Sequence, residues 1–545
     1  MNQFAQVDPR DNVAIALFNI AAKTNILIGG RKVLIRENIK TKQKFAVQNF
    51  KKGEEVLMYG LLIGRAAKTI FEGQAITVEN LQPLSNQDVD YSCDWECPLP
   101  DISKFNGRTF EGYHRPDGKV GTSNIWLLIP LGFVNCRFTD AIERAFSSAL
   151  GYHYECDFTI DADTLIEKLK NGASDHEVFN CQVCAENKKT PENPVFENID
   201  GIKVLKYDRC YGIHKQEDLC RLLAGYINHP NTAGATILNL GDQIDETHFL
   251  RREIEKKDPD FSKLVYFIEQ TRNENVNVLI EEAVKKTFIG LRKANKIERK
   301  PAPISKLTLG LACGGSDGFS GISANPVLGY VSDLLIALGG TSVLSEFPEL
   351  LSVKKEIVSR CKTQSTARRF LKLMKTNFEK NEIANSGEEL YFLNEQRRYD
   401  LVNMAMLAAG ALKKAGAAEV VDVLDYGESI SLSGLNLLCT SDNEVESTTG
   451  LAGSGCNMIV FTTGVGSMTG NPLTPVLKMS SNTNLYKQVN NLIDIDAGTI
   501  ILGKDTIQSK GEELLNLLID VASGYTKCKA DKYGQDGFIP WKRGN

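Results

Sequence analysis

The sequence predicts an α/β fold in which a small N-terminal β module precedes a large two-part α/β core. Residues 11–82 contain short apolar runs separated by Gly, Asn and Lys pairs, a spacing typical of a small, mostly β module. From about residue 109, apolar runs alternate with segments of helical periodicity, which favours a partly parallel sheet. The 545 residues suffice for about three or four domains.

The order of these patterns predicts the domain organisation. We expect the β module over 7–85, a linker over 86–108, and the two parts of the core over 109–300 and 301–545. The linker contains Pro, Asp and Ser and shows no periodicity. In the core, "NIWLLIPLGFVNC" precedes the helical "FTDAIERAFSSAL", and "KLTLGLACGGSDG" precedes "NPVLGYVSDLLIALGG". The segment "RRFLKLMKTNFEKN" predicts an amphipathic surface helix.

Composition excludes several classes of partner. The net charge is −5 and the short basic runs are mixed with acids, so we expect no nucleic-acid partner. No apolar run reaches the roughly 18–20 residues that a bilayer span needs, and the N-terminus lacks the pattern of a signal peptide. Thirteen scattered cysteines favour reduced thiols. The sequence therefore predicts a cytoplasmic protein with no membrane partner.

The stretch "LACGGSDGFSGISANP", residues 311–326, concentrates glycine, serine and one cysteine directly after an apolar run. Two interpretations are open. The glycines could form a tight turn where backbones pack closely. Alternatively, the loop could surround a small polar ligand, with Cys313, Ser316, Asp317 and Ser320 as contacts and backbone N–H groups holding an anion.

Four loops follow apolar strands in distant parts of the chain: "LGFVNC", "LNLGDQ", "LACGGSDG" and "TTGVGSMTG". Ligands of open α/β sheets lie at the carboxyl ends of strands, so we expect these loops to meet at one site. Asp317 and Glu346 lie near the ends of apolar segments and could bind a metal or act as a base. The alternative for each is a helix cap or a surface acid. His229 is expected to be a capping or turn histidine.

Longer motifs resemble a known family. "FEGYHRPDGKVGTSNIWLLIP", "LACGGSDGFSGISANPVLGYVSDLLIALGGTSVLSEFPE", "VVDVLDYGE", "SGCNMIVFTTGVGS" and "NNLIDIDAGTI" are similar to the altronate dehydratase and galactarate dehydratase family of sugar-acid dehydratases. The stretch "VDPRDNVAIAL … EEVLMYGLLIGRA" resembles the SAF-type module that precedes the catalytic part in that family. The resemblance extends from about residue 7 to residue 502.

The resemblance implies a carbon–oxygen lyase that removes water from a hexonate or hexarate. A base takes the proton next to the carboxylate, an enediolate forms, and the β-hydroxyl leaves to give a 2-keto-3-deoxy acid. The family also includes lyases that eliminate sulfite. Iron(II) or another divalent cation, such as manganese or magnesium, is implied as cofactor, because a metal offsets the developing charge. A small sugar acid is the implied partner, and homo-oligomer formation stays open.

On this resemblance the site residues divide into three groups. Asp317 and Glu346 are the catalytic candidates, and Cys313, Cys210 and Asp242 are the metal candidates. The substrate-binding candidates are Gly314, Gly315, Ser316, Ser320, Asn325, Thr462 and Thr463.

Several positions depart from the family pattern. Gln43, Phe133, Asp242, Gln243 and Val465 stand where the family pattern has an imidazole, two thiols, a carboxylate and a guanidinium. Valine cannot provide the bidentate pairing of an arginine with a carboxylate. These replacements leave a second hypothesis open, a catalytically inactive paralogue that binds a sugar acid or a protein partner.

Overall fold

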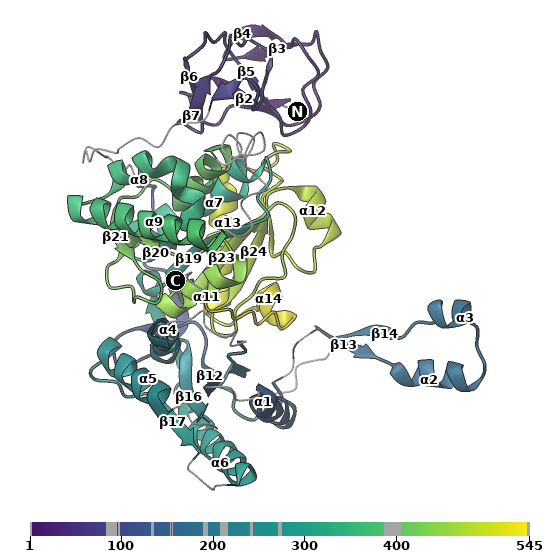
Figure 1. Ribbon diagram of the computed structural model, residues 1–545, viewed down its shortest axis with the longest axis vertical. Helices are drawn as coiled ribbons and strands as arrows, with labels where there is room; N and C mark the ends of the chain where they lie inside the picture. Colours follow the sequence, from purple (N-terminus) through teal and green to yellow (C-terminus); the bar gives the residue numbers. More distant parts are fainter. Residues whose placement is uncertain are drawn as a thin grey trace.

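The structure is a computed structural model, shown in Figure 1. It describes residues 3–82, 95, 99–131, 136–152, 154, 156–188, 194–207, 216–239, 244–270, 275–385 and 405–541. None of the helices in these ranges combines the length and the apolar character that a bilayer span needs.

The N-terminal module is built from short antiparallel strands, as expected. Its sheets have the orders β1-β2-β5-β8, β3-β4 and β6-β7-β9. The alternating buried and exposed residues of β3 place one face of that hairpin on the module's own core. The strand bounds are β1 Phe4–Ala5, β2 Val13–Ala16, β3 Asn25–Ile28, β4 Arg31–Leu34, β5 Lys44–Ala46, β6 Glu55–Met58, β7 Leu61–Ala66, β8 Ala75–Ile76 and β9 Leu81–Gln82.

The middle part contains a parallel sheet in the order β15-β12-β16-β17, which we call the middle sheet. Its strands are β12 (Ile125–Leu131), β15 (Gly201–Val204), β16 (Thr232–Asn239) and β17 (Leu264–Glu269), and its helices are α1 (Cys136–Leu150), α4 (Gln216–Asn228), α5 (Ile244–Lys257) and α6 (Val276–Ala294). A hairpin of β13 (Cys156–Ile160) and β14 (Cys184–Lys188) carries α2 (Ala162–Lys170) and α3 (Asp175–Phe179) away from the body, as Figure 1 shows.

A small antiparallel sheet in the order β11-β10-β18 joins the two parts of the core. Its strands are β10 (Thr109–His114), β11 (Val120–Gly121) and β18 (Arg299–Pro303). The boundary that we expected at residue 300 lies inside β18, whose pairing with β10 connects the beginning and the end of the middle part.

The C-terminal part forms a parallel sheet, the C-terminal sheet, in the order β21-β22-β20-β19-β23-β24-β25. Its strands are β19 (Thr308–Gly314), β20 (Thr341–Leu344), β21 (Val420–Leu424), β22 (Gly434–Leu438), β23 (Met458–Thr463), β24 (Val476–Ser480) and β25 (Ile495–Asp496). Nearly continuous burial along β19, β20 and β23 matches a parallel sheet covered on both faces. The strand order reverses between β19 and β23, and ligands of open α/β sheets bind at such a switch point.

Helices accompany this sheet on both sides in Figure 1. They are α7 (Ala324–Ala337), α8 (Lys354–Arg360), α9 (Gln364–Asn385), α11 (Glu444–Ser454), α12 (Thr483–Gln488), α13 (Ile507–Ala522) and α14 (Lys529–Lys532), with 3-10 turns η1 (Ile304–Lys306), η2 (Ser320–Ile322), η3 (Phe347–Val353) and η5 (Lys413–Ala415). Helix α9 contains the segment expected to be an amphipathic surface helix, and it buries Phe370 and Met374. The edge-to-face contact of Phe370 with Phe347 fixes α9 on η3.

The side chain of Asn457 connects the beginning of the C-terminal sheet with the small β11-β10-β18 sheet that precedes it. Its Oδ1 accepts the Thr308 N–H at 2.8 Å, and its Nδ2 donates to the carbonyls of Lys306 and Val120, each at 3.0 Å. Its carbonyl accepts the Thr122 hydroxyl at 2.7 Å. Because these groups are buried, the bonds compensate their loss of water and fix one domain against the other.

The four strand-end loops follow strands of two sheets: β12 and β16 belong to the middle sheet, and β19 and β23 to the C-terminal sheet. Residues 132–135 and 240–243 of two of these loops lie outside the described residues, so the expectation that all four loops meet at one site stays a prediction. Only the ends of β19 and β23 are paired neighbours, through Cys313 with Thr462 and Gly314 with Thr463. Alternation of strands and helices identifies parallel strands, but it does not say which of them share a sheet.

Candidate functional site

The candidate site lies at the carboxyl ends of the strands beside the switch point. Cys313 and Gly314 end β19, Glu346 follows β20, Thr463 ends β23, and Ser481 follows β24. Parallel strands place these ends along one edge of the sheet, so residues from distant parts of the chain come together there.

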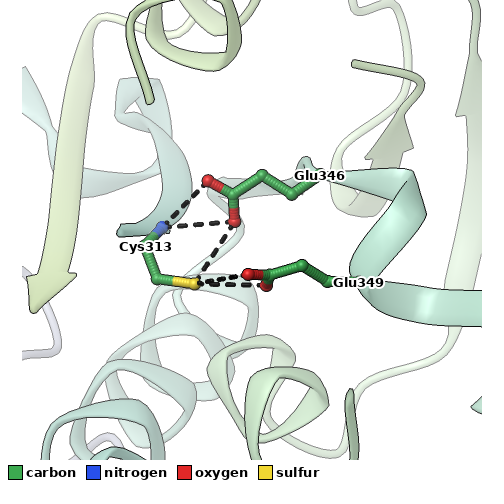
Figure 2. Close-up of side chains that lie close together, drawn as sticks. All are labelled: Cys313, Glu346 and Glu349. Carbon is green, nitrogen blue, oxygen red and sulfur yellow. Dashed lines mark hydrogen bonds between the residues drawn. The ribbon is translucent and has the colours of Figure 1, made fainter. Parts of the chain in front are cut away.

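A buried cluster of Cys313, Glu346, Glu349 and Lys414 forms its inner part, and Figure 2 shows the first three. The Cys313 thiol lies 3.2 Å from Glu349 Oε2 and 3.5 Å from Glu346 Oε2, and the Cys313 N–H donates to the Glu346 carboxylate at 3.1 Å. The Lys414 Nζ contacts the Cys313 Sγ at 2.6 Å, Glu346 Oε2 at 2.7 Å and Glu349 Oε2 at 3.3 Å. The Glu346 and Lys414 side chains are each 1 % exposed, whereas Glu349 is 30 % exposed.

The electrostatics follow from this burial. Burial raises the Glu346 pKa to about 7, and Lys414 only partly opposes that rise. Burial and the two carboxylates raise the pKa of the Cys313 thiol well above its usual value. Burial alone would lower the Lys414 pKa, but Cys313, Glu346 and Glu349 around it raise the pKa above its usual value. The cluster therefore holds a neutral thiol and a charged ammonium at neutral pH.

Glu346 has a backbone conformation that side chains rarely adopt, with φ of 67°. Its N–H donates to the Thr440 hydroxyl at 2.9 Å, which helps to hold this conformation. Lys42 (φ 73°) and Tyr59 (φ 59°), both at the same site, are also left-handed. In the described part of the chain, the remaining non-glycine residue with positive φ is Lys23. Such strain persists where the surrounding structure holds it, often at functional sites.

Asp317 anchors the glycine-rich loop. Its carboxylate accepts the Ser481 hydroxyl at 2.7 Å, the Phe319 N–H at 3.0 Å and the Ser320 hydroxyl at 3.1 Å. It also forms an ion pair with Lys42 of the N-terminal module at 2.7 Å. Burial would raise the Asp317 pKa, but these donors, Lys42 foremost, hold it below the usual value. A carboxylate so occupied is a positioning group and a poor proton acceptor.

A cavity of about 260 Å³ lies between this loop and the N-terminal module. Its lining comprises Lys44, Tyr59, Ser316, Asp317, Gly318, Ser320, Gly321, Asn325, Met406, Leu407 and Gly410. The Ser316 hydroxyl lies 3.7 Å from the Cys313 Sγ, so Ser316 connects the cavity with the buried cluster.

The glycines of the loop allow the N-terminal module to pack closely against the loop beside the cavity. A Cβ at Gly318 would lie 2.7 Å from the Lys42 Cβ, and a Cβ at Gly321 would lie 2.6 Å from the Tyr59 hydroxyl. Gly315 has φ of 60°, which side chains rarely adopt. The close-packing interpretation of the stretch is therefore confirmed, because the missing side chains admit the N-terminal module, whereas the ligand-binding interpretation stays a prediction.

The structure brings most of the expected substrate residues to this edge. Ser316, Ser320 and Asn325 line the cavity, whereas Thr462 donates to Asn325 Oδ1 at 2.7 Å and so orients that amide. Thr463 Oγ1 accepts the Gly466 N–H at 3.0 Å and shapes the loop after β23. Gly314 packs against Glu444, whose Oε1 would lie 2.0 Å from a Cβ there.

Sequence reasoning missed Glu349, Lys414, Lys42, Lys44 and Tyr59. Glu349 follows Glu346 by three residues in "SEFPE", a spacing that turns both carboxylates toward Cys313. The other four carry no motif of their own. Their place at the site depends on how the module and η5 pack on the sheet.

The expected residues Cys210 and Asp242, and the replaced positions Phe133 and Gln243, lie outside the described residues. Gln43 is exposed, and its Oε1 accepts the Lys40 N–H at 2.7 Å, so it closes a turn. Val465 is 68 % exposed and lies over Gly315 at the loop after β23. His229 is a buried turn histidine: its Nε2 bonds the Cys456 carbonyl at 2.9 Å, and its Nδ1 accepts the Asn231 N–H at 3.0 Å.

The cluster contains the donor atoms that a divalent cation would need. Cys313, Glu346 and Glu349 offer donor atoms that all lie within 4.8 Å of one another, the grouping that a metal needs. However, the Lys414 ammonium contacts all three, and its buried side chain takes the position of the cation. A second cation beside it would meet strong repulsion in this low-dielectric surrounding. As folded, the cluster is balanced by lysine and does not fit an additional metal ion.

Fold and site together define a multidomain α/β protein with a polar site where a β module covers the switch point of a parallel sheet. Three family models match in succession: the altronate/galactarate dehydratase SAF domain over 2–84, the D-galactarate dehydratase/altronate hydrolase second domain over 112–295, and the D-galactarate/altronate dehydratase C-terminal domain over 304–545.

Curated relatives agree over nearly the whole length. Altronate dehydratase of Escherichia coli (strain K12) is 29 % identical over 543 residues, 96 % of each chain. Altronate dehydratase of Bacillus subtilis (strain 168) is 28 % identical, again over 96 % of each chain. Galactarate dehydratase (L-threo-forming) of E. coli K12 is 27 % identical over 97 % of this chain and 95 % of that protein. The chain belongs to the altronate/galactarate dehydratase family as a divergent member.

Proposed function

We propose that the protein is a sugar-acid dehydratase, a carbon–oxygen lyase that converts a hexonate or hexarate into a 2-keto-3-deoxy acid. The observation that carries this proposal is the buried Glu346, whose pKa is raised to about 7 and which is linked through Cys313 and Ser316 to a polar cavity at the switch point. The relatives named altronate and galactarate dehydratase support the substrate class.

Dehydration needs a base for the proton next to the carboxylate and positive charge for the enediolate. A pKa near 7 makes Glu346 a suitable proton acceptor, whereas Asp317 is held ionised and fully bonded. Cys313 and Ser316 lie between Glu346 and the cavity and provide the path for the proton. Lys414 would remain charged and stabilise the ionised carboxylate of Glu346 before it accepts the proton.

The resemblance implies iron(II), manganese or magnesium as cofactor. Because Lys414 holds the position of the cation in the described cluster, no step of this proposal depends on a metal. A metal-dependent enzyme and an enzyme that uses Lys414 in place of the metal differ in the metal content of the purified protein.

The test uses protein purified without oxygen. Metal content is measured first, and 2-keto-3-deoxy acid formation from altronate, galactarate and a panel of other hexonates and hexarates is then followed with and without added iron or manganese. Turnover of at least one acid that disappears in Glu346→Gln supports the proposal. Absence of turnover across the panel by folded protein contradicts it.

A second candidate function is an inactive sugar-acid-binding paralogue. The observation in its favour is Val465, an exposed apolar side chain that lies over Gly315 in the loop after β23, at a position where the family pattern has an arginine. An inactive paralogue should bind a sugar acid but form no 2-keto-3-deoxy acid. The Val465→Arg variant should likewise show no product formation.

A further inference from the structure

One wall of the cavity belongs to the N-terminal module and consists of Lys44 and Tyr59. Lys44 begins β5, and Tyr59 follows β6 in the turn before β7. The module is held against the glycine-rich loop by the Lys42–Asp317 ion pair, by the Lys42 ammonium 5.1 Å from the centre of the Phe319 ring, and by the packing at Gly318 and Gly321. These contacts fix Lys44 and Tyr59 relative to the sheet edge.

Lys44 is a partly buried cation without a partner. In the described ranges its ammonium makes no ion pair and no hydrogen bond, in contrast to the ammonium of Lys42 two residues earlier. Burial lowers the Lys44 pKa, and the charge of Asp317 only partly opposes this. A desolvated ammonium without a partner is costly, and an anion in the cavity would remove that cost.

Tyr59 is 3 % exposed and has the left-handed φ of 59°. Its hydroxyl finds no hydrogen-bond partner among the residues that the structure describes, although buried tyrosines usually have one. The side chain passes close to Gly321 and Gly410 and lines the cavity. A buried, strained side chain with a free polar end facing a cavity points to a ligand.

The charges facing the cavity favour an anion. Asp317 would repel a carboxylate, but Lys42 neutralises it at 2.7 Å. Lys44 therefore leaves an excess of one positive charge on the lining. The uncharged polar groups opposite, Ser316, Ser320 and Asn325, suit the hydroxyls of a polyol.

We propose that Lys44 and Tyr59 bind the carboxylate of the sugar acid, so that the N-terminal module supplies the specificity-determining residues of the site. This inference rests on the proposed function for the class of ligand. Lys44 forms the ion pair, and the Tyr59 hydroxyl donates to the same carboxylate or to the neighbouring hydroxyl. Ser316, Ser320 and Asn325 at the sheet edge bind the remaining hydroxyls of the polyol chain.

The experiment compares wild type with Lys44→Met, Lys44→Arg and Tyr59→Phe. Lys32→Met is the matched control, because Lys32 is an exposed lysine of the same module on β4. Calorimetry measures binding of altronate, galactarate and the other acids of the panel. Altritol, the uncharged hexitol that corresponds to altronate, is the control ligand. KM and kcat are measured for any acid that is turned over.

We expect Lys44→Met to raise Kd and KM at least tenfold with kcat changed less than threefold. Lys44→Arg should recover part of the loss, and Tyr59→Phe should raise Kd about threefold to tenfold. Lys32→Met should change nothing, and the difference between acid and hexitol should disappear in Lys44→Met. Unchanged thermal unfolding of Lys44→Met shows that the module is still folded.

The outcomes separate this inference from the proposed function. Turnover by wild type with unchanged Kd and KM in Lys44→Met overturns the inference and leaves the dehydratase intact. Acid binding by wild type that depends on Lys44 but yields no product overturns the dehydratase and supports the inference. Failure of folded wild type to bind any acid of the panel overturns both.

Discussion

The Lys42 ammonium lies 2.7 Å from the Asp317 carboxylate and so connects the N-terminal module to the glycine-rich loop. Asp317 is 8 % exposed in its side chain, whereas Lys42 is 40 % exposed. The pair therefore contributes less to global stability than to the position of the module above the cavity, because the exposed partner is screened by solvent.

Asp317→Ala is expected to destabilise the protein and to weaken sugar-acid binding. The substitution leaves the Ser481 and Ser320 hydroxyls and the Phe319 N–H without their acceptor, at a cost of about 3 kcal/mol. Urea unfolding measures the loss. A double-mutant cycle with Lys42→Met should give a coupling of about 1 kcal/mol. Zero coupling would show that the ion pair does not hold the module.

Lys414→Met tests which cation the buried cluster accepts. Removal of the ammonium leaves Glu346 and Glu349 without their counter-charge and should cost about 3–5 kcal/mol at pH 8. Added manganese or iron(II) should restore much of the thermal stability of this variant, because a vacant position now lies between three donors. Wild type should show no such response.

Lys478→Met is the control for Lys414→Met. Lys478 is equally buried but bonds to Gln535, so its loss exposes no carboxylate pair. It should therefore show no rise in thermal stability with metal. A strong metal response of wild type would contradict the conclusion that lysine occupies the cation position.

Glu346→Gln should lower kcat by at least a hundredfold, because the amide cannot accept the proton. In wild type, kcat/KM should rise with pH and level off above about 7, since burial raises the Glu346 pKa to that value and only the ionised form is a base. Initial rates between pH 5 and 9 measure the profile. Glu255→Gln, on the exposed side of α5, should leave both rate and profile unchanged. If the residual kcat/KM of Glu346→Gln still rose with pH and levelled off near 7, the base would be another group.

His229 should make the protein sensitive to acid. Burial lowers its pKa to about 3, and its Nδ1 already accepts an N–H, so the folded state holds the ring neutral. Because the unfolded chain binds a proton at His229 below about pH 6.5 and the folded chain does not, the free energy of unfolding decreases as the pH falls from 6.5 toward 3. The loss at pH 4.5 should be about 3 kcal/mol.

His229→Gln should flatten this part of the stability curve, measured by urea unfolding between pH 4 and 8. The exposed His248 provides the control, because His248→Gln should leave the slope unchanged. An equal slope in wild type and His229→Gln would place the acid sensitivity elsewhere.

Sequence patterns predicted the β module and the two-part α/β core, and the structure confirms both. These predictions succeeded because buried strands and glycine-rich turns leave periodic, local signals in the sequence. The binding role of the stretch around Cys313 and Asp317 stays a prediction. The patterns did not predict that Lys414, a hundred residues after Cys313, would contact its sulfur, because that contact depends on the packing of η5 against α7. Likewise, nothing local in "KTKQKF" distinguishes Lys42, which pairs with Asp317, from Lys44, which faces the cavity.

The division of the cavity between two distant parts of the chain limits how the protein can be dissected. A fragment that begins at residue 109 would keep the C-terminal sheet, the Cys313 cluster and the glycine-rich loop, but it would lose Lys42, Lys44 and Tyr59. Its loop would then face water with Asp317 unpaired. Truncations that remove the first eighty residues should thus abolish binding of the sugar acid, and they also remove part of the shared hydrophobic core.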